Sequence, residues 1–186
     1  MGKVIYMLNV SLDGFVEGPD HSLDWSLVDD ELHGWFNDHM RAVSMSLYGR
    51  RLYELMSGHW PHADSDPAAG EVEREFGRLW VETPKVVFSS TLESVDWNSR
   101  LVRGSAVEEV GRLKADVDGD MEVGGPTLAG SLIRAGLVDE YCLVIHPVAI
   151  GAGTPFFPPG MDRTQLRLIE SGGFASGVTY LRYARR

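Results

Sequence analysis

The chain has one cysteine and no long apolar run, and these two features exclude an intramolecular disulfide and argue against a membrane-spanning segment. Because Cys142 is the only cysteine in 186 residues, an intramolecular disulfide is impossible, which fits a reducing compartment. Cys142 lies in an apolar segment, and we interpret it as a small core residue rather than a nucleophile. No apolar run reaches the roughly 18 residues that a membrane span needs, and no signal-peptide pattern is present. We therefore expect a cytoplasmic protein that does not act at a membrane.

Positive charge is also scarce. The 17 lysines and arginines are outnumbered by 27 acidic residues, which gives a formal net charge of -10 at pH 7. A nucleic-acid-binding surface needs a basic face, so nucleic acid is not an expected partner. A few local arginines remain available for one small anionic ligand.

The composition that remains is that of a folded protein. Hydrophobic residues make up 44% of the chain and charged residues 24%, which argues against disorder. A chain of 186 residues can bury one sizeable core, so we expect a single domain over residues 1–186.

Hydrophobic periodicity predicts alternating strands and helices. Residues 4–12 form a nearly continuous apolar run, typical of a strand that is buried on both faces. Leu32, Trp35, Phe36 and Met40 recur at helical spacing behind an acidic start. The further predicted strands are 42–48, 85–89, 121–123, 140–150, 165–169 and 178–184, the further predicted helices are 50–56, 71–81, 105–115 and 126–135, and residues 59–70 form a predicted loop. The pattern favours an α/β fold with a mixed sheet, mostly parallel at its centre, and antiparallel C-terminal strands.

A strand turns into a helix through Gly124-Gly125. Such a turn lets backbone N–H groups approach a phosphate, with the positive end of the helix dipole behind them. A tight turn without a ligand has the same signature, so this motif leaves both interpretations open. The pattern Gly-x-x-x-x-Gly-Lys-Ser/Thr of an ordinary P-loop is absent.

Two other strand ends carry polar groups of the same kind. Gly49 precedes Arg50 and Arg51 at the start of a predicted helix, where cations oppose the helix dipole. An anionic ligand explains these arginines, and a solvated charged turn is the alternative. Ser89-Ser90-Thr91 follows another strand, at the carboxyl end where open α/β sheets bind ligands, although alone it would be a turn cluster.

Metal binding is not expected. His59 and His62 flank Pro61, which prevents a regular helix there, and no third ligand is evident.

Seven segments in chain order carry a resemblance to a known family. They are Ser11-Leu12-Asp13-Gly14-Phe15-Val16, Gly49-Arg50-Arg51-Leu52-Tyr53-Glu54, Val87-Phe88-Ser89-Ser90-Thr91-Leu92, Leu113-Lys114, Val123-Gly124-Gly125, Gly136-Leu137-Val138-Asp139-Glu140 and Pro147-Val148-Ala149-Ile150-Gly151-Ala152-Gly153. The chain resembles the dihydrofolate reductase-like family, and specifically its riboflavin biosynthesis reductase (RibD C-terminal domain-like) branch. The resemblance implies a three-layer fold with helices on both faces of the sheet.

The resemblance also implies an NADPH-dependent reductase that transfers hydride to a C=N or C=O bond of a small heterocyclic or ribosylaminopyrimidine-like substrate. In this resemblance Gly124, Gly125 and Thr127 cradle the pyrophosphate, while Arg50 and Arg51, with Ser90 and Thr91, hold the 2′-phosphate. The implied cofactor site is Val16, Glu17, Gly49, Arg50, Arg51, Ser89, Ser90, Thr91, Gly124, Gly125, Pro126 and Thr127. Val16 and Glu17 are expected to lie against the nicotinamide.

The substrate half of the site is less clearly marked. Asp13 is implied to bond a ribose or substrate hydroxyl, with a turn aspartate as the alternative. The buried acid of true dihydrofolate reductases falls on Asp30 when counted forward from Trp25 and on Leu32 when counted back from Trp35-Phe36. Trp25, Phe36 and Trp60 are candidate walls for a planar substrate.

The alternatives to the reductase are a non-catalytic nucleotide-binding module and a true dihydrofolate reductase. Relatives commonly pair through their C-terminal strands. We therefore expect a homodimer.

Overall fold

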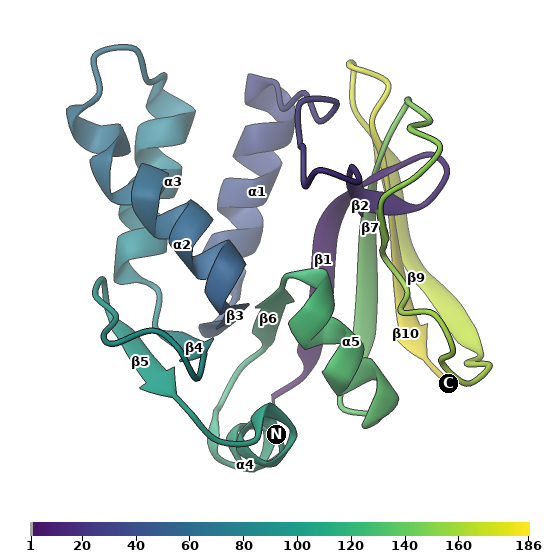
Figure 1. Ribbon diagram of the computed structural model, residues 1–186. Coiled ribbons are helices and arrows are strands. Elements are labelled where there is room, and N and C mark those ends of the chain that lie inside the picture. The colour runs from purple at the N-terminus through teal and green to yellow at the C-terminus, as the bar shows by residue number, and fades with distance from the viewer. Residues whose placement is uncertain (1) are drawn as a thin grey trace.

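The computed structural model describes residues 2–186, and its centre is one eight-stranded sheet (Figure 1). The strands are β1 Val4–Ser11, β2 Phe15–Glu17, β3 Met45–Gly49, β4 Lys85–Phe88, β5 Ser99–Val102, β6 Met121–Gly124, β7 Glu140–His146, β8 Thr154–Pro155, β9 Leu166–Gly173 and β10 Thr179–Arg185. The helices are α1 Asp30–Ala42, α2 Arg50–His59, the 3-10 helix η1 Trp60–Ser65, α3 Glu71–Glu82, α4 Ala106–Asp116 and α5 Pro126–Arg134.

The large sheet has the strand order β5-β4-β3-β6-β1-β7-β10-β9, and β2 and β8 form a separate antiparallel pair. The strands from β5 to β7 in this order run parallel, whereas β10 is antiparallel to β7 and β9 is antiparallel to β10. The predicted mixed sheet, with its parallel centre and antiparallel C-terminal strands, is therefore confirmed.

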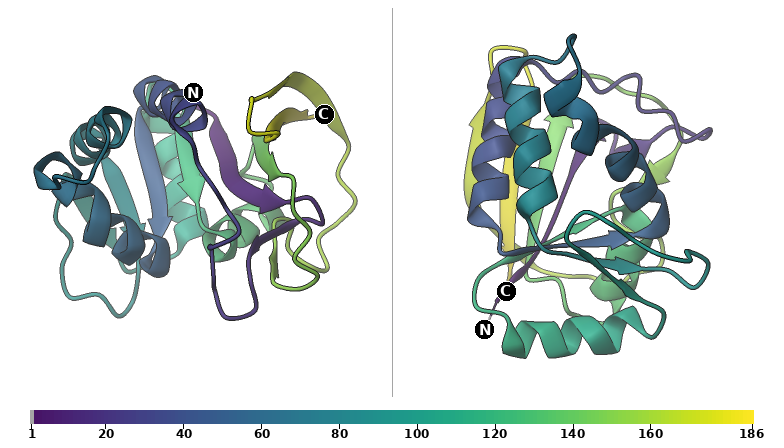
Figure 2. Two further views of the ribbon diagram at one scale, coloured as in Figure 1. Left: turned by 90° about the horizontal axis from the view of Figure 1, so that it is seen from above. Right: turned by 90° about the vertical axis from the view of Figure 1, so that its left-hand side faces the viewer.

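Side chains of the central strands point alternately to the two faces of the sheet and pack into a hydrophobic layer on each face. Leu47 of β3 packs in a cluster with Val110 of α4 and Leu132 of α5, while its neighbour Tyr48 packs with Trp80 of α3 on the other face. This alternation follows from the two-residue period of a strand. Figure 2 shows the result, with α1 and α3 over one face of the sheet and α4 and α5 over the other.

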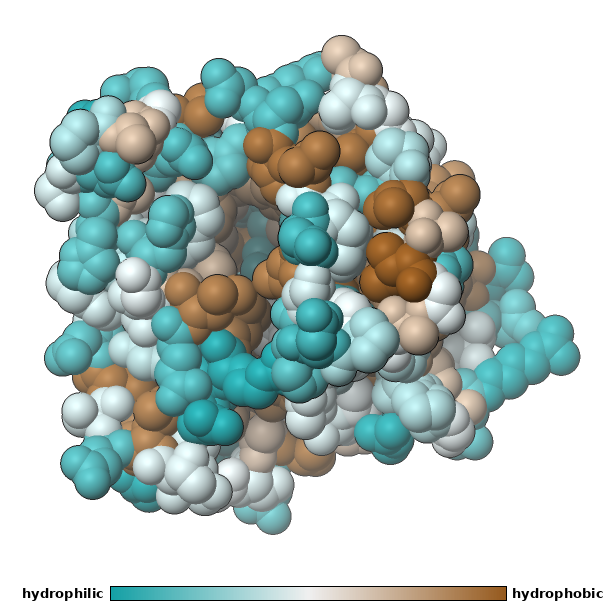
Figure 3. Space-filling view, turned by 45° about the horizontal axis from the view of Figure 1, so that its top comes forward, coloured by the Kyte–Doolittle hydropathy of each residue, from teal (hydrophilic) through white to brown (hydrophobic). Residues whose placement is uncertain are grey.

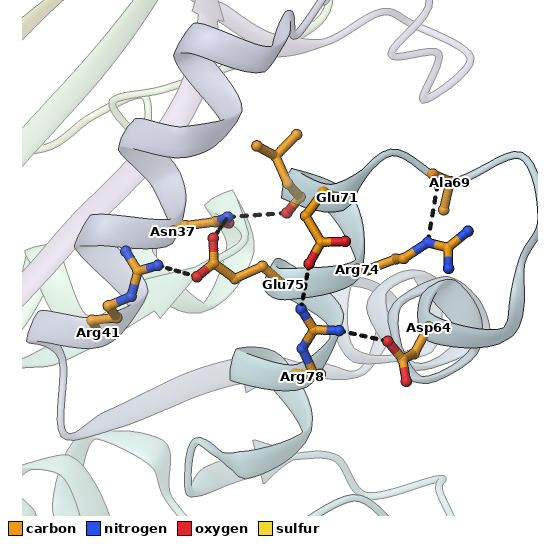
Figure 4. Close-up of polar contacts among 9 residues, drawn as sticks. Asn37, Arg41, Asp64, Ala69, Glu71, Arg74, Glu75 and Arg78 are labelled. Carbon is orange, nitrogen blue, oxygen red and sulfur yellow. Dashed lines mark hydrogen bonds and ion pairs between the residues drawn. The ribbon is translucent and has the colours of Figure 1, made fainter.

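Polar contacts hold α1 against α3 above the sheet (Figure 4). The amide of Asn37, which is fully buried, donates to Glu75 at 2.9 Å, and Arg41 pairs with the same carboxylate. Arg78 of α3 reaches Asp64 of η1 at 2.7 Å. These contacts fix the three helical segments to one another. Other residues of the same segments, among them Phe36, Trp60 and Phe76, form one wall of a cavity described below.

The start of α1 explains its acidic cluster. Asp29 is the N-cap, and its carboxylate accepts from the backbone N–H of Leu32 at 2.9 Å. Asp30 and Glu31 occupy the first turn, where the helix dipole favours negative charge.

Several predicted boundaries need correction. The predicted loop 59–70 contains η1, because proline is tolerated in the first turn of a helix. Ala42 ends α1 and does not begin a strand. The predicted strand 140–150 stops at His146, before Pro147, which has no N–H to donate to a sheet.

Three short strands were not predicted. β2, β5 and β8 have three, four and two residues, too few for a periodic pattern.

Within residues 2–186, no helix combines the length and the apolar character needed to cross a membrane.

Candidate active site

Two strand-to-helix turns meet at the carboxyl edge of the parallel strands. β3 ends at Gly49, which is the N-cap of α2, and β6 ends at Gly124, after which Gly125 is the N-cap of α5. β3 and β6 are neighbours in the sheet, with Tyr48 opposite Gly124. The two turns therefore lie side by side, as expected for adjacent parallel strands.

Gly124 and Gly125 have different reasons to be glycine. A Cβ on Gly124 would come within 2.4 Å of the side chain of Leu52 and 3.1 Å of the Tyr48 ring. Gly125 has φ +92°, in the left-handed region that favours glycine. The first glycine thus allows α2 to approach β6, and the second sets the direction in which α5 leaves the strand.

The amino ends of α2 and α5 lack the caps that the other α-helices have. α1 is capped by Asp29, α4 by Ser105, and the side chain of Glu73 caps α3. α2 and α5 have neither a side-chain cap nor an acidic residue in the first turn. Since the first N–H groups of a helix have no acceptor within the helix, both ends remain able to bind an anion.

Both of these helix ends open into one cavity of about 740 Å³. Figure 3 shows the carboxyl-edge side of the molecule, with a hollow bordered by hydrophobic residues. The lining residues are Leu8, Val16, Glu17, His21, Leu23, Gly49, Arg50, Arg51, Leu52, Leu55, Phe88, Gly125, Pro126, Thr127, Leu128 and Ser131. Eight residues of the cofactor site expected from the sequence are among them: Val16, Glu17, Gly49, Arg50, Arg51, Gly125, Pro126 and Thr127.

Glu17 is the centre of a polar network at this cavity. Its carboxylate lies 2.8 Å from the guanidinium of Arg51, 2.9 Å from Nδ1 of His21 and 2.8 Å from the hydroxyl of Thr154. Burial alone raises the pKa of Glu17, but the hydrogen bonds from Arg51, Thr154 and His21 outweigh it and leave the pKa below its usual value. The carboxylate therefore stays ionised and holds Arg51 at the cavity wall.

Arg50 is held more loosely. It pairs with Glu54 one helical turn later, at 3.1 Å, and both side chains are about half exposed. Such exposed pairs are weak, typically about 0–1 kcal/mol, so Arg50 can turn toward an anionic ligand at little cost.

A second cavity of about 200 Å³ adjoins the first, and both are lined by Leu8 and Leu52. Its lining is Met7, Leu8, Asn9, Val28, His33, Phe36, Met40, Tyr48, Leu52, Met56, Trp60, Phe76, Glu122 and Gly124. Phe36 and Trp60, which the sequence suggested as walls for a planar substrate, both face this cavity.

Polar groups of the second cavity include Glu122 and His33. Glu122 Oε2 lies 2.8 Å from Nε2 of His39, but the ring N–H of His39 does not point along this line, so within residues 2–186 neither atom has a hydrogen-bond partner. Nδ1 of His33 is also buried without a partner. Burial lowers the pKa of His33, which keeps its imidazole neutral at pH 7.

Asp13, which was expected to contact a ribose or substrate hydroxyl, lines neither of the two cavities. Its carboxylate accepts from the Ser11 hydroxyl at 2.7 Å and from the backbone N–H groups of Ile150 and Gly151 at 3.2 and 2.7 Å. These hydrogen bonds lower the pKa of Asp13. The residue therefore ties the turn after β1 to the segment after β7, as a turn aspartate does.

Asp30 and Trp25 also lie outside both cavities. Asp30 is exposed in the first turn of α1, whereas Leu32, the other position for the acid, is fully buried and apolar. Trp25 packs edge-on against His146 with ring centroids 5.6 Å apart. Neither candidate position thus supplies a buried acid.

Ser89, Ser90 and Thr91 directly follow Phe88, which lines the larger cavity. The Ser89 hydroxyl accepts from the backbone N–H groups of Thr91 and Leu92 at 3.1 and 3.0 Å. Ser89 thus shapes the turn, while Ser90 and Thr91 are exposed, and none of the three lines the cavity.

One residue of the second cavity could have been recognised from the sequence. Glu122 is an acidic residue in a strand that is otherwise buried and apolar, and such a residue needs an explanation. His33 and His39 could not be recognised in this way, because a histidine occurs on both the buried and the exposed face of an amphipathic helix.

Among residues 2–186, no group of three or more His, Cys, Asp or Glu side chains is arranged to hold a metal ion.

The chain matches a known family and a curated relative over nearly its whole length. The family described as the RibD C-terminal domain matches residues 2–180. The uncharacterized protein YyaP of Bacillus subtilis (strain 168) is 34% identical over 182 residues, which cover 97% of this chain and 94% of the relative.

Two solved structures extend the comparison. A putative riboflavin biosynthesis protein from Shewanella sp. PV-4 superposes with a TM-score of 0.75 at 22% identity, over 99% of both chains. A dihydrofolate reductase from Enterococcus faecalis, solved with NADP(H) and RAB-propyl, superposes with a TM-score of 0.66 at 16% identity, over 100% of this chain and 97% of the other. The fold is that of dihydrofolate reductase, and the chain belongs to the RibD C-terminal domain family.

Proposed function

We propose that this protein is an NADPH-dependent reductase that acts on a small heterocyclic substrate with a C=N or C=O bond. One observation carries the proposal. The two uncapped helix ends, α2 with its arginines and α5 with its glycine turn, open into the same large cavity, and a smaller apolar cavity adjoins it.

The larger cavity suits a phosphate-rich dinucleotide. A pyrophosphate would lie at Gly125, Pro126 and Thr127, where the first N–H groups of α5 are available. Arg50 and Arg51 would bind the 2′-phosphate that distinguishes NADPH from NADH, together with the exposed hydroxyls of Ser90 and Thr91. The Enterococcus faecalis neighbour, solved with NADP(H), supports the choice of this cofactor class.

Bound NADPH would supply a hydride to the acceptor. The protein's own contribution is positional. Leu8 and Leu52 line both cavities, so a ligand in each would meet across these two side chains. Apolar walls that include Phe36 and Trp60 would exclude water from the acceptor and orient a flat ring.

The two alternatives receive less support. A true dihydrofolate reductase would need a buried acid at Asp30 or Leu32, and neither position provides one. A nucleotide-binding module without catalysis would not need the second cavity, where Glu122 and His33 have buried polar atoms with no hydrogen-bond partner among residues 2–186.

Cofactor binding can be tested by isothermal titration calorimetry with NADPH and NADH. Arg50→Ala removes a charge-assisted hydrogen bond of about 1.5–3 kcal/mol, so NADPH affinity should fall about tenfold or more while NADH affinity stays the same. Arg112→Ala, in an exposed arginine of α4, is the control and should change neither. If the wild-type protein bound neither nucleotide, the proposal would be wrong.

Catalysis is tested separately by following NADPH oxidation with a panel of pterins, ribosylaminopyrimidines and ketones. Oxidation by any of them identifies the acceptor class. Tight NADPH binding with no oxidation across the panel would favour the non-catalytic module.

A further inference from the structure

Asn9 and His146 form a polar pair in an apolar part of the sheet. Asn9 lies opposite Val144 in the pairing of β1 with β7, and His146 follows two residues later, so the three side chains point to the face that α1 covers. Val144 is fully buried, and His146 is only 2% exposed. Polar groups at such positions lose their hydration, which is costly unless hydrogen bonds replace it.

The hydrogen bond between the two side chains sets the direction of the Asn9 amide. Nε2 of His146 lies 3.0 Å from Oδ1 of Asn9. Because Oδ1 can only accept, Nε2 carries the ring proton and donates it. Burial lowers the pKa of His146, so its imidazole is neutral at pH 7. Trp25 packs edge-on against the same ring and holds it in place.

The amide nitrogen of Asn9 carries two N–H groups that the protein does not use. Within residues 2–186, the contact with His146 is the only hydrogen bond of the Asn9 side chain. Asn9 is partly exposed, and it lines the smaller cavity. The amide therefore has donors available to a ligand in this cavity.

The other N–H groups around this cavity are less suited to a ligand. Trp60 donates its indole N–H to Sδ of Met56 at 3.2 Å. Nδ1 of His33 is buried, and its ring packs against Trp60 and Phe76. If Asn9 and His146 served packing alone, two apolar side chains could fill the same space without the cost of desolvation.

We propose that Asn9 is the hydrogen-bond donor by which the smaller cavity selects its substrate, and that His146 is the positioning residue that keeps this donor turned toward the cavity. The substrate then carries an acceptor, a carbonyl oxygen or a ring nitrogen with a free lone pair, on the edge that meets β1. This inference rests on the proposed function, since it assigns the residue that selects a C=O or C=N compound. Asn9 directly follows Leu8, which lines both cavities, so the bound acceptor lies near their junction.

The tautomer of His146 is the first test. Two-bond ¹H–¹⁵N NMR spectra of the wild-type protein at pH 7 should show that this imidazole is protonated at Nε2. Protonation at Nδ1 alone would make Nε2 an acceptor and would require the amide nitrogen of Asn9 to face His146. That result would overturn the proposal.

The second test compares two flat probes of similar shape, 1-indanone, which has a carbonyl oxygen, and indane, which has none. The ratio of their affinities cancels the apolar burial that both probes share. In NMR titrations of the ¹⁵N-labelled wild-type protein, 1-indanone should shift the side-chain NH₂ signals of Asn9, and indane should leave them in place. Equal shifts from the two probes, or binding of neither, would contradict the assignment.

The variant Asn9→Asp keeps the side-chain shape and still accepts from His146, but it has no N–H to donate. The ratio of 1-indanone affinity to indane affinity should therefore fall about fivefold or more. Asn98→Asp is the matched control, because Asn98 is exposed and lines neither of the two cavities. A ratio that is unchanged in Asn9→Asp, or that falls equally in Asn98→Asp, would show that Asn9 is not the selecting donor.

Two variants separate positioning from packing at His146. His146→Gln supplies an amide N–H where Nε2 lies and should keep the wild-type affinity ratio. His146→Phe keeps a ring but removes the donor, so the Asn9 amide can turn and the ratio should fall about threefold or more. Equal ratios in the two variants, each shown by urea denaturation to be folded, would mean that His146 does not position the amide.

NADPH binding by the same proteins separates this inference from the proposed function. His146→Gln should bind NADPH as the wild-type protein does, because neither Asn9 nor His146 lines the larger cavity. Failure of the wild-type protein to bind NADPH would overturn the proposed function alone, and the two probes would still decide the role of Asn9.

Discussion

The carboxylate of Glu17 lies 2.8 Å from the guanidinium of Arg51, and this contact joins β2 to the amino end of α2 at the wall of the larger cavity. The carboxylate is largely buried, whereas the arginine side chain is about half exposed. An anionic ligand in this cavity must therefore either bind Arg51 while Arg51 is still paired with Glu17, or replace Glu17 as its partner.

Neutralising this carboxylate should strengthen NADPH binding. In Glu17→Gln, Arg51 is no longer paired with a negative charge, and the repulsion between Glu17 and the cofactor phosphates disappears. We expect NADPH affinity to rise about three- to tenfold, equivalent to roughly 0.7–1.4 kcal/mol. Calorimetric titration at fixed ionic strength measures this change.

The control is Glu54→Gln, which removes the partner of Arg50 in an exposed pair. Because such pairs are worth about 0–1 kcal/mol and are screened by solvent, the change in NADPH affinity should be smaller than in Glu17→Gln. Weaker NADPH binding in Glu17→Gln would instead mean that the carboxylate positions Arg51 for the cofactor.

Two glycine-to-alanine substitutions should have opposite effects on stability. Gly125 has φ +92°, so Gly125→Ala should lower the free energy of unfolding by about 1–2 kcal/mol and weaken NADPH binding. Gly111 is an exposed position inside α4 with open space around an added Cβ, and Gly111→Ala should raise that free energy by about 0.5–1 kcal/mol. Urea denaturation measures both changes. An unchanged free energy of unfolding in Gly125→Ala would show that the turn can adopt a backbone conformation that alanine tolerates.

A buried carboxylate at the start of β7 should contribute to stability only above acidic pH. Glu140 is 4% exposed and pairs with Lys3 at 2.8 Å and Arg182 at 2.6 Å. Burial raises its pKa, but these partners outweigh that effect and leave the pKa lowered. A lowered folded-state pKa means that the stabilisation is present above the unfolded-state pKa and is lost as pH falls through the folded-state value.

Glu140→Gln should therefore lower the free energy of unfolding by about 1.5–3 kcal/mol at pH 7, the usual contribution of a hydrogen bond to a charged group. The difference from wild type should shrink as the pH falls below 4.5, the ordinary glutamate value from which the pKa of Glu140 is lowered. Urea denaturation at a series of pH values measures this, with the exposed Glu93→Gln as control. A difference that is independent of pH would show that packing, and not charge, stabilises this position.

The cofactor half of the site was predictable because it depends on strand ends. Parallel strands bring their carboxyl ends to one edge, so Gly49, Arg50 and Gly125 had to lie near each other once their strands were recognised. The structure has these three residues around one cavity. Their binding of NADPH remains a prediction.

The substrate half was not predictable, because it depends on how helices cover the sheet. Glu122 and His39 are 83 positions apart (122 − 39), and only the packing of α1 against β6 brings them together. The expected contact of Asp13 with a ribose or substrate hydroxyl was not found for a different reason: an aspartate before glycine has the same sequence signature whether it binds a ligand or stabilises a turn. The structure gives its carboxylate three donors from the protein itself.

The outer strand β9 leads to a prediction about assembly. β9 is at the edge of the large sheet, and Leu168 and Ile169 on it are 48% and 38% exposed. An exposed edge strand with apolar side chains is a typical site for pairing with another chain. We expect two copies of the protein to associate through β9 and β10, and sedimentation velocity at micromolar concentration should detect a dimer.

Leu168→Glu should convert this dimer to a monomer, because it sets a charge within the apolar contact and opposite its symmetry mate. Val107→Glu is the control: Val107 is 37% exposed on α4, a helix that contacts α5, and its substitution should leave the dimer intact. A wild-type protein that sediments as a monomer, or a Leu168→Glu variant that remains dimeric, would show that β9 is not the contact.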